Sequence, residues 1–395
     1  MTTTRLAGRD TVTGHGLCII VTEDRIAAIE PADLTSGPYL AAGLIDLQVN
    51  GYRGLDLNDG ALTPARVSEL TRMMPGLGVT TYLPTLITAS RASLLSALAA
   101  IAEARRQDPL CARMIPFVHV EGPFLAPGDG PRGGHPREHV RSPDLDEVAE
   151  WQHVSGDLVG MITLSPHHDQ IETFIRALTE QGILVGIGHT AATADQIRCA
   201  VAAGARLSTH LGNGAAATLP RHPNFIWAQL ADDRLDAGFI ADGFHLPADT
   251  FKAMLRAKGL ERSYLVSDKT ALGGMPPGIY DQPIGGRVEV GSDGRLSVVG
   301  TPYLAGASRP LRQNVALAIG MADLTLSQAL QLATRNPGRF VGNRGRLAVG
   351  EAADLILFDW DEGAASLDIR ETYVAGEKVA RRLTTPASFI PGLSI

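Results

Sequence analysis

The chain has 395 residues, of which 45% are hydrophobic and 19% are charged, and its formal net charge is −7. This is the composition of a globular protein with room for one large domain and a small one, and the lack of a basic run argues against nucleic acid and membranes as partners. Because the N-terminus has no apolar signal-peptide core and no segment reaches the ~18 uninterrupted apolar residues of a membrane-spanning helix, we expect a cytoplasmic protein.

The first 42 residues predict short strands at 17–21 and 25–29, separated by the polar residues 22–24. Such a segment is too short to bury a core alone, so it needs a partner elsewhere in the chain. The C-terminal stretch supplies one, because residues 345–358 and 371–374 again have the apolar, β-branched composition of strands. We therefore predict a small β-sandwich domain built from residues 1–42 and 345–395.

From Gly43 onward, apolar strands alternate with amphipathic stretches of helix length. Two of these stretches have clear ends, since residues 193–203 lie between a Thr cap and Gly204, and residues 247–258 begin at a proline and stop before Gly259. The strand candidates are residues 44–49, 80–86, 115–120, 160–164, 183–188, 206–210, 237–241 and 263–267. Eight strands with crossovers predict an α/β fold, a (β/α)8 TIM-type barrel over residues 43–344, rather than an open doubly wound sheet.

A Gly/Pro-rich insertion interrupts the predicted barrel at about residues 273–306. Its alternating segments at 287–290 and 295–299 predict a hairpin. Two helices, at about 309–321 and 327–334, follow it before the C-terminal β segment. We expect the insertion to be an addition to the barrel rather than one of its eight units.

The stretch His119-Val-Glu-Gly-Pro-Phe124 places a carboxylate, Glu121, at the end of an apolar strand that Gly122 and Pro123 terminate. Such a carboxylate costs several kcal/mol unless a cation, a hydrogen-bond network or a reaction compensates for it. The structural alternative is a glutamate that caps a helix or forms a salt bridge.

Other polar residues stand at the ends of the remaining strands, where a barrel places its active site. These residues are Gln48, Asn50, His189, His210, Asp242 with His245, and Asp268. A His₂Glu set made of Glu121, His189 and His210 leaves a position open for water, as catalytic zinc sites do. A single histidine is more often a structural, hydrogen-bonded one, but three candidate ligands at the exits of the third, fifth and sixth strands favour a metal site.

Two further side chains have the right type and position for acid–base work. Asp268, at the exit of the last strand, is a candidate to take a proton from water and return it to a leaving nitrogen. The alternative is a carboxylate paired with Lys269. His245 is a candidate to bind the substrate carbonyl, and its alternative is a contact at the start of the following helix.

The chain resembles the amidohydrolase superfamily and, within it, the N-acetylglucosamine-6-phosphate deacetylases. The matching stretches are Gly43-Leu-Ile-Asp-Leu-Gln-Val-Asn-Gly51, His119-Val-Glu-Gly-Pro-Phe124, Gly188-His-Thr190, Thr209-His-Leu-Gly-Asn213, Ile240-Ala-Asp-Gly-Phe-His245, Leu265-Val-Ser-Asp268 and Gly350-Glu-Ala-Ala-Asp-Leu355. They run in family order over nearly the whole length. The family replaces the His-x-His of its superfamily, as Gln48-Val-Asn50 does here, which implies one metal ion per chain rather than two.

The resemblance also implies roles for individual residues. Glu121, His189 and His210 bind the metal, Asp268 is the catalytic acid and base, and His245 helps to polarise the acetyl carbonyl. The substrate contacts it implies involve Asn213, the backbone of Gly214, Gln48, and His135 in a mobile loop. The metal is expected to be zinc, with iron and cobalt as alternatives, and the protein a homodimer that acts on a small molecule.

The loop after His210 departs from the family pattern. Gly212 and Ala215 replace a bulky aromatic residue and a methionine, which we expect to enlarge or reshape the pocket. Arg221 remains as a candidate for a phosphate group, although an exposed loop arginine is more often simply solvated. The sequence therefore predicts hydrolysis of the N-acetyl amide of an amino sugar, N-acetylglucosamine-6-phosphate, to the free amine and acetate. The alternatives are a deacylase of an unphosphorylated N-acetyl amino sugar or an N-acyl amino acid, and a catalytically inactive scaffold.

Overall fold

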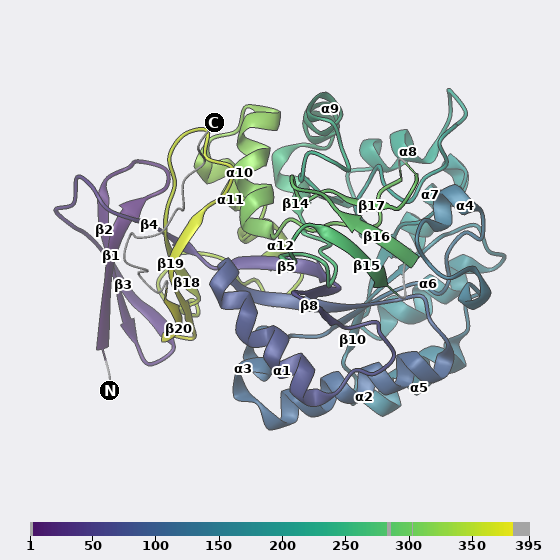
Figure 1. The fold of residues 1–395 in the computed structure, drawn as a ribbon, viewed down its shortest axis with the longest axis horizontal. Coiled ribbons are helices and arrows are strands. Elements are labelled where there is room, and N and C mark those ends of the chain that lie inside the picture. Colours follow the sequence, from purple (N-terminus) through teal and green to yellow (C-terminus); the bar gives the residue numbers. More distant parts are fainter. Residues whose placement is uncertain (1–2, 283–285, 302, 382–395) are drawn as a thin grey trace.

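The structure is a computed structural model that describes residues 3–282, 286–301 and 303–381. A sheet made from both ends of the chain lies beside a larger barrel of strands and helices (Figure 1). Residues 382–395 of the predicted small domain, and residues 283–285 and 302 of the predicted insertion, lie outside the described part.

The larger body is an eight-stranded parallel sheet in the order β14-β13-β12-β11-β10-β9-β8-β5. A parallel bridge between Val49 and Lys269 connects the first strand to the segment after the last one, so the sheet curls into a near-barrel. The eight strands are β5 (Leu44–Val49), β8 (Val79–Ile87), β9 (Val118–Glu121), β10 (Val159–Leu164), β11 (Leu184–Ile187), β12 (Leu207–Ser208), β13 (Asp236–Phe239) and β14 (Ser263–Leu265). All nine residues of β8 are buried, as expected of a strand covered on both faces. The predicted α/β barrel is confirmed.

Helices cover the outer face of the barrel (Figure 1). Their ends follow the predicted signals: Thr193 and Gln196 form a reciprocal cap on α7, which ends at Gly204, and α9 ends at Gly259. The helices are α1 (Pro64–Met73), α2 (Arg91–Gln107), α3 (Pro109–Met114), α4 (Asp129–Arg132), α5 (Leu145–Ser155), α6 (Ile171–Glu180), α7 (Ala194–Ala203), α8 (Phe225–Ala231), α9 (Ala248–Lys258), α10 (Leu311–Ala322), α11 (Leu326–Gln331) and α12 (Arg335–Gly338). Among the described residues, no helix is both long and apolar enough to cross a membrane.

The two chain ends meet in a seven-stranded mixed sheet of order β20-β19-β18-β4-β1-β2-β3. Its strands are β1 (Thr3–Asp10), β2 (Gly16–Thr22), β3 (Arg25–Pro31), β4 (Tyr39–Ala42), β18 (Leu355–Asp359), β19 (Asp368–Val374) and β20 (Glu377–Arg381). Antiparallel pairing of β4 with β18 joins the N-terminal half to the C-terminal half. The two halves of the predicted sandwich are thus parts of one hydrogen-bonded sheet, and their apolar side chains share a core that includes Ile19, Leu40 and Leu355.

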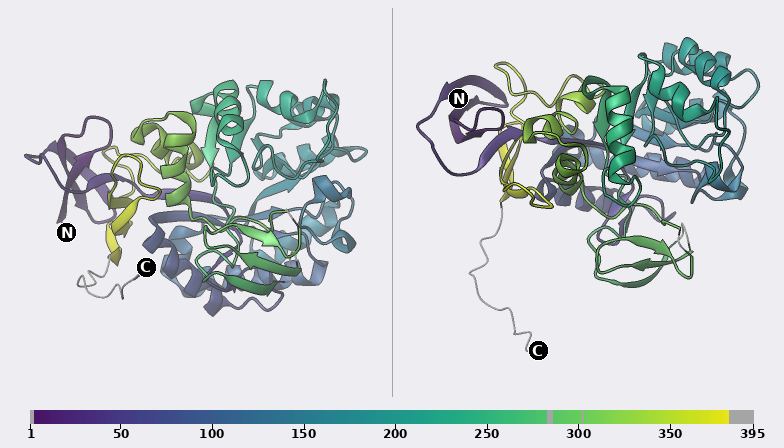
Figure 2. Two further views of the ribbon diagram at one scale, coloured as in Figure 1. Left: turned by 45° about the horizontal axis from the view of Figure 1, so that its top comes forward. Right: turned by 90° about the horizontal axis from the view of Figure 1, so that it is seen from above.

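The insertion forms a separate three-stranded antiparallel sheet of β15 (Gly278–Gln282), β16 (Gly286–Val290) and β17 (Leu296–Val298). The predicted hairpin corresponds to β16 and β17, while β15 adds a strand that the sequence pattern did not indicate. Figure 2 (right) shows this sheet projecting from the barrel, away from the terminal sheet. A two-stranded hairpin, β6 (Gly51–Tyr52) with β7 (Leu55–Asp56), follows β5.

Candidate metal centre

Three of the predicted ligands converge at the carboxyl ends of the strands. Glu121 ends β9, whereas His189 and His210 follow β11 and β12, and all three side chains are buried. Nε2 of His210 lies 2.9 Å from Oε1 of Glu121, and Nε2 of His189 lies 3.2 Å from Nε2 of His210 and 3.5 Å from the same oxygen. Across the part of the chain that the structure describes, this is the one group of three or more His, Cys, Asp or Glu side chains arranged to hold a metal ion.

The donor set fits a divalent cation. Ligand atoms placed tetrahedrally about 2.0–2.2 Å from a zinc ion lie about 3.4 Å from one another, close to the three separations observed. Burial works against the charge of Glu121, but hydrogen bonds from His189 and His210 hold the pKa of its carboxyl well below the usual value. Glu121 is therefore a carboxylate, as metal ligation requires.

The backbone turns sharply where these side chains enter the site. His189 has a φ of 48°, His210 of 29° and Asp268 of 48°, a left-handed region that residues other than glycine rarely adopt. Strained conformations of this kind persist where the surrounding structure holds them, commonly at functional sites. Gly214 packs against the ring of His189 so closely that a Cβ there would lie 2.7 Å from Nδ1. A glycine is thus needed at 214, which the sequence alone did not indicate.

Neighbouring groups orient the ligands. Nδ1 of His189 lies 2.9 Å from the backbone carbonyl oxygen of Pro131. Because a carbonyl only accepts, Nδ1 carries a hydrogen, and Nε2 is the nitrogen that faces the other candidate ligands. The amide of Gln48 donates to Oε1 of Glu121 at 3.0 Å. Gln48 therefore contacts one of the candidate ligands directly.

Asp268 is partly buried beside the candidate metal centre and accepts a hydrogen bond of 2.8 Å from the amide of Asn50. Burial and the charge of Glu121 raise the pKa of Asp268 to about 6, although the charge of His210 opposes this. A carboxyl group of this kind suits proton transfer near neutral pH. Lys269, the alternative partner considered for Asp268, instead places its ammonium 3.6 Å from the carboxylate of Asp46.

His135 reaches the centre from the loop that contains α4. Its Nε2 lies 3.2 Å from Nε2 of His189 and 3.8 Å from Oε2 of Glu121, and its Nδ1 contacts the hydroxyl of Thr88 at 2.9 Å. Burial and the charge of His189 lower the pKa of His135 well below its usual value. A neutral His135 thus borders the metal ligands.

The remaining predicted substrate residues lie in the loop after β12. Asn213 is partly buried and donates to the backbone carbonyl of His210 at 3.2 Å. Arg221 is exposed, and its guanidinium forms no hydrogen bond or ion pair with any described residue. A Cβ at Gly212 would lie 3.0 Å from the side chain of Leu246 and 3.4 Å from that of Met254, and the enlarged or reshaped pocket expected from Gly212 and Ala215 stays a prediction.

His245 comes from the segment after β13. Its Nδ1 lies 2.7 Å from Oδ2 of the buried Asp242, and His245 is among the groups whose proximity lowers the pKa of Asp268 against the effect of burial. The structure thus brings His245 near the predicted acid–base residue.

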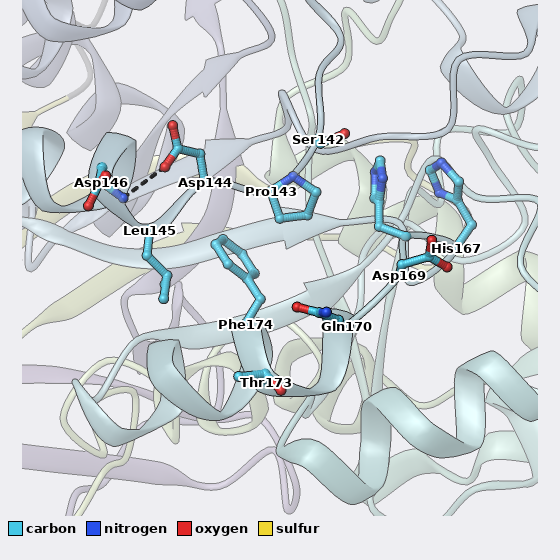
Figure 3. Close-up of a pocket in the computed structure, with 11 residues that line it drawn as sticks. Ser142, Pro143, Asp144, Leu145, Asp146, His167, Asp169, Gln170, Thr173 and Phe174 are labelled. Carbon is cyan, nitrogen blue, oxygen red and sulfur yellow. Dashed lines mark hydrogen bonds between the residues drawn. The ribbon is translucent and has the colours of Figure 1, made fainter.

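A polar groove of about 610 Å³ lies between the segment that leads into α5 and the segment that leads into α6 (Figure 3). Its walls are residues 142–146 on one side and 167–170 with Thr173 and Phe174 on the other. Nδ1 of His167 contacts Oγ of Ser165 at 2.8 Å, and Ser165 contacts Thr190, the residue after His189, at 2.7 Å. None of Glu121, His189 and His210 lines this groove, which was not predicted from the sequence.

The barrel, with two histidines and a glutamate at its carboxyl-terminal edge and an aspartate at the exit of its last strand, defines a metal-dependent hydrolase of the amidohydrolase type. The family model "Amidohydrolase family" matches residues 39–379, and the chain belongs to this family of enzymes.

Two curated relatives and one solved structure specify the resemblance. The chain is 33% identical over 372 residues to N-acetylglucosamine-6-phosphate deacetylase of Bos taurus, covering 90% of this chain and 87% of the relative. It is 30% identical over 366 residues to N-acetylgalactosamine-6-phosphate deacetylase of Escherichia coli O157:H7, covering 89% and 92%. A mutant N-acetyl-D-glucosamine-6-phosphate deacetylase of Mycobacterium smegmatis, solved with N-acetyl-D-glucosamine-6-phosphate, superposes with a TM-score of 0.83 at 27% identity, covering 95% of this chain and 99% of that one.

Proposed function

We propose that this enzyme hydrolyses the N-acetyl amide of N-acetylglucosamine-6-phosphate and releases glucosamine-6-phosphate and acetate. The observation that carries the proposal is the buried convergence of Glu121, His189 and His210 beside the carboxyl of Asp268. Relatives with this activity in their names, at about 30% identity over most of the chain, support the choice of substrate.

The proposed chemistry divides between the cation and the protein. A divalent cation held by Glu121, His189 and His210 supplies Lewis-acid chemistry, polarising a carbonyl and making water more acidic. Asp268 takes the proton from the attacking water and returns it to the leaving nitrogen of the amide. Asn50 holds the carboxyl of Asp268 in place through its 2.8 Å hydrogen bond. His245 helps to hold and polarise the acetyl carbonyl.

The sugar is proposed to lie against the loops around the metal centre. Asn213, the backbone of Gly214 and His135 contact its hydroxyl groups, and Gln48 fixes the carboxylate of Glu121 beneath them. Arg221 is the proposed partner of the 6-phosphate, because its exposed guanidinium has no competing partner among the described residues. A guanidinium binds phosphate through charge-assisted, often bidentate hydrogen bonds.

The metal, its stoichiometry, the assembly, the location and the domain division are also part of the proposal. The cation is zinc, with iron or cobalt as alternatives, since all suit His₂Glu donors. One ion binds per chain because the amides of Gln48 and Asn50 stand at the first strand exit, where the superfamily has two histidines. The enzyme is proposed to act as a homodimer in the cytoplasm, with residues 43–344 as its catalytic domain and residues 1–42 with 345–395 as its small domain.

A second candidate is the galactosamine epimer, N-acetylgalactosamine-6-phosphate, on which the 30% identical relative of E. coli acts by name. A third candidate is an unphosphorylated N-acetyl amino sugar or an N-acyl amino acid, which the isolated, exposed position of Arg221 keeps open.

The test is acetate release from a panel of these four compounds by the metal-loaded enzyme. The proposal predicts the highest kcat/KM on N-acetylglucosamine-6-phosphate. A preference of tenfold or more for any other compound rejects the proposed substrate in favour of that one. Acetate release from none of them rejects the deacetylase proposal as a whole.

A further inference from the structure

The barrel closes at a seam between β5 and its last strand, β14, together with the segment 266–269 that follows β14. One β-bridge crosses this seam in the described part of the chain, from Val49 to the segment. The backbone N–H groups of Ile45 and Leu265, one on each edge, donate instead to the carbonyl groups of residues 332–333 at 2.8 Å. Backbone pairing therefore joins the two edges only at the end near Val49, and side-chain contacts across the rest of the seam gain importance.

The carboxylate of Asp46 spans this seam. Asp46 lies on β5 and is wholly buried. Its Oδ1 accepts from the backbone N–H of Ser267 at 3.0 Å, and its Oδ2 accepts from the hydroxyl of the same residue at 2.5 Å. Hydrogen bonds to an ionised carboxylate are shorter and stronger than those between neutral groups. Two of them fix Ser267 against β5 where the backbone ladder is missing.

Lys269 supplies the opposite charge. Its side chain is also wholly buried, and its ammonium lies 3.6 Å from Oδ2 of Asp46, the separation of an ion pair rather than of a hydrogen bond. The ammonium has no hydrogen-bond partner among the described residues. Removing one partner of a buried ion pair leaves an uncompensated charge and is strongly destabilising, whereas replacing both by apolar groups is often neutral. Asp46 and Lys269 therefore depend on each other.

Asp268 stands between the two residues that this pair holds. Its φ of 48° lies in a region that a residue other than glycine adopts only where its surroundings hold it. Ser267, before it, is bound by Asp46, and the carbonyl of Lys269, after it, accepts from the backbone N–H of Asn50 at 3.0 Å. The amide of Asn50 also donates to the Asp268 carboxyl at 2.8 Å. The strained residue is thus held from both sides, and each of these contacts leads to β5 or the residue that follows it.

We propose that Asp46 and Lys269 form a positioning pair for the acid–base carboxyl. Asp46 binds Ser267 across the seam, Lys269 balances the buried charge of Asp46, and the carboxyl of Asp268 is thereby held beside the candidate metal centre. The kinetic part of this inference rests on the proposed function, in which Asp268 moves the proton. Neither side chain of the pair forms a hydrogen bond or an ion pair with a candidate metal ligand in the described part of the chain.

A second buried lysine provides a matched control. Lys258, at the end of α9, is 1% exposed, and its ammonium donates to the backbone carbonyl groups of Gln229 at 2.9 Å and Asp232 at 2.7 Å. These carbonyl groups belong to the C-terminal end of α8, so Lys258 caps a helix and holds no residue of the seam. Lys258→Met should therefore lower the melting temperature and leave kcat unchanged.

A double-mutant cycle separates positioning from general stability. Asp46→Leu/Lys269→Met removes both charges together, which avoids a lone buried charge. Its kcat should fall at least tenfold, because a displacement of about 1 Å at a reacting group can cost about 100-fold. KM should change less than threefold and metal content should stay at the wild-type value. In an Asp268→Asn background, where no base needs to be positioned, the same two substitutions should change kcat less than threefold.

The results that overturn the proposal follow from this cycle. A fall in kcat of less than tenfold with Asp268 present shows that the pair does not position the base. Equal falls in the two backgrounds, or a loss of metal, assign the pair a general structural role.

The place of Asp268 is measured directly by comparing crystal structures of the metal-loaded wild type and Asp46→Leu/Lys269→Met. The proposal predicts that Asp268 leaves the left-handed region or that its carboxyl moves out of hydrogen-bonding distance of the Asn50 amide. A variant in which both features are unchanged overturns the proposal.

The two proposals fail in distinguishable ways. If the wild-type enzyme releases no acetate from N-acetylglucosamine-6-phosphate, the proposed function fails, while the crystal structures still decide whether the pair positions Asp268. If the double variant does not fold, Ser267→Ala takes its place, because it removes the 2.5 Å bond to Asp46 and keeps both charges. It should lower kcat at least threefold with Asp268 present and leave kcat unchanged in Asp268→Asn. The same kcat ratio in both backgrounds overturns the proposal.

Discussion

Replacing Asp268 by asparagine removes the proposed proton acceptor with little change in shape. The structure indicates that the substitution costs little stability. The one side chain hydrogen-bonded to Asp268 is Asn50, and Oδ1 of Asn50 is buried with no partner among the described residues. After the substitution, the amide of Asn50 can turn and accept from the new NH₂ group. The net loss is therefore at most that of one hydrogen bond, about 0.5–1.5 kcal/mol.

The predicted effect on turnover is much larger. General acid–base catalysis contributes typically 10²–10⁴-fold, so kcat of Asp268→Asn should fall by about that factor, equivalent to about 3–5 kcal/mol of barrier. Because the pKa of Asp268 is raised to about 6, the wild-type rate should decline as pH falls through that value, when the base becomes protonated. The variant should lose this acid limb.

The assay measures acetate release, metal content and melting temperature on one preparation. Asp354→Asn is the matched control, since Asp354 lies at the terminal sheet and its carboxylate accepts from the backbone N–H of Ala375 at 2.7 Å. That variant should melt earlier with kcat unchanged. If Asp268→Asn instead keeps a near-normal kcat with a lowered melting temperature, Asp268 is structural and the acid–base assignment is wrong.

Further predictions concern the ligands and the phosphate. His189→Ala and His210→Ala should each lose metal and activity together, because two remaining ligands cannot complete the site. Elemental analysis and acetate release measure the two losses. Full metal occupancy in either variant would remove that residue from the ligand set. In the metal-free protein, burial lowers the pKa of His210 but the hydrogen bond and charge of Glu121 raise it to about 9. Metal affinity, measured by calorimetry, should thus rise about tenfold per pH unit up to about pH 9 and then level off; an affinity that is constant between pH 6 and 8 would contradict this. Arg221→Ala should lower kcat/KM for the 6-phosphorylated substrate by about 10- to 100-fold, because one charge-assisted contact to the phosphate is lost. The kcat/KM for the unphosphorylated substrate should not change. The exposed Arg335→Ala is its control, and equal losses on both substrates would reject the phosphate role.

The convergence of the metal ligands was predictable because the carboxyl ends of parallel strands meet at one edge of a barrel. Glu121, His189 and His210 each end or follow an apolar segment, so their proximity follows from the fold class alone. The terminal sheet was predictable for a similar reason, since neither chain end can bury a core alone.

Contacts that depend on the backbone or on side-chain direction were not predictable. The carbonyl of Pro131, which orients His189 from 58 residues away, has no side-chain signature in the sequence. Lys269 follows Asp268 directly, and adjacency suggested an ion pair. The backbone turns into the left-handed region at Asp268, however, and Lys269 instead pairs with Asp46 on the neighbouring strand β5. The third strand of the insertion, β15, lies outside the two alternating segments from which the hairpin was predicted.

The central claim is that one cation held by Glu121, His189 and His210 is required for amide hydrolysis. The most direct measurement strips the enzyme with a chelator, adds zinc in steps, and follows acetate release from N-acetylglucosamine-6-phosphate with bound metal per chain. The account predicts no activity in the stripped enzyme and a linear return that is complete at one equivalent. Activity that survives at less than 0.05 metal per chain, on the order of one-twentieth of the one-ion site, or that requires a second equivalent, would contradict it.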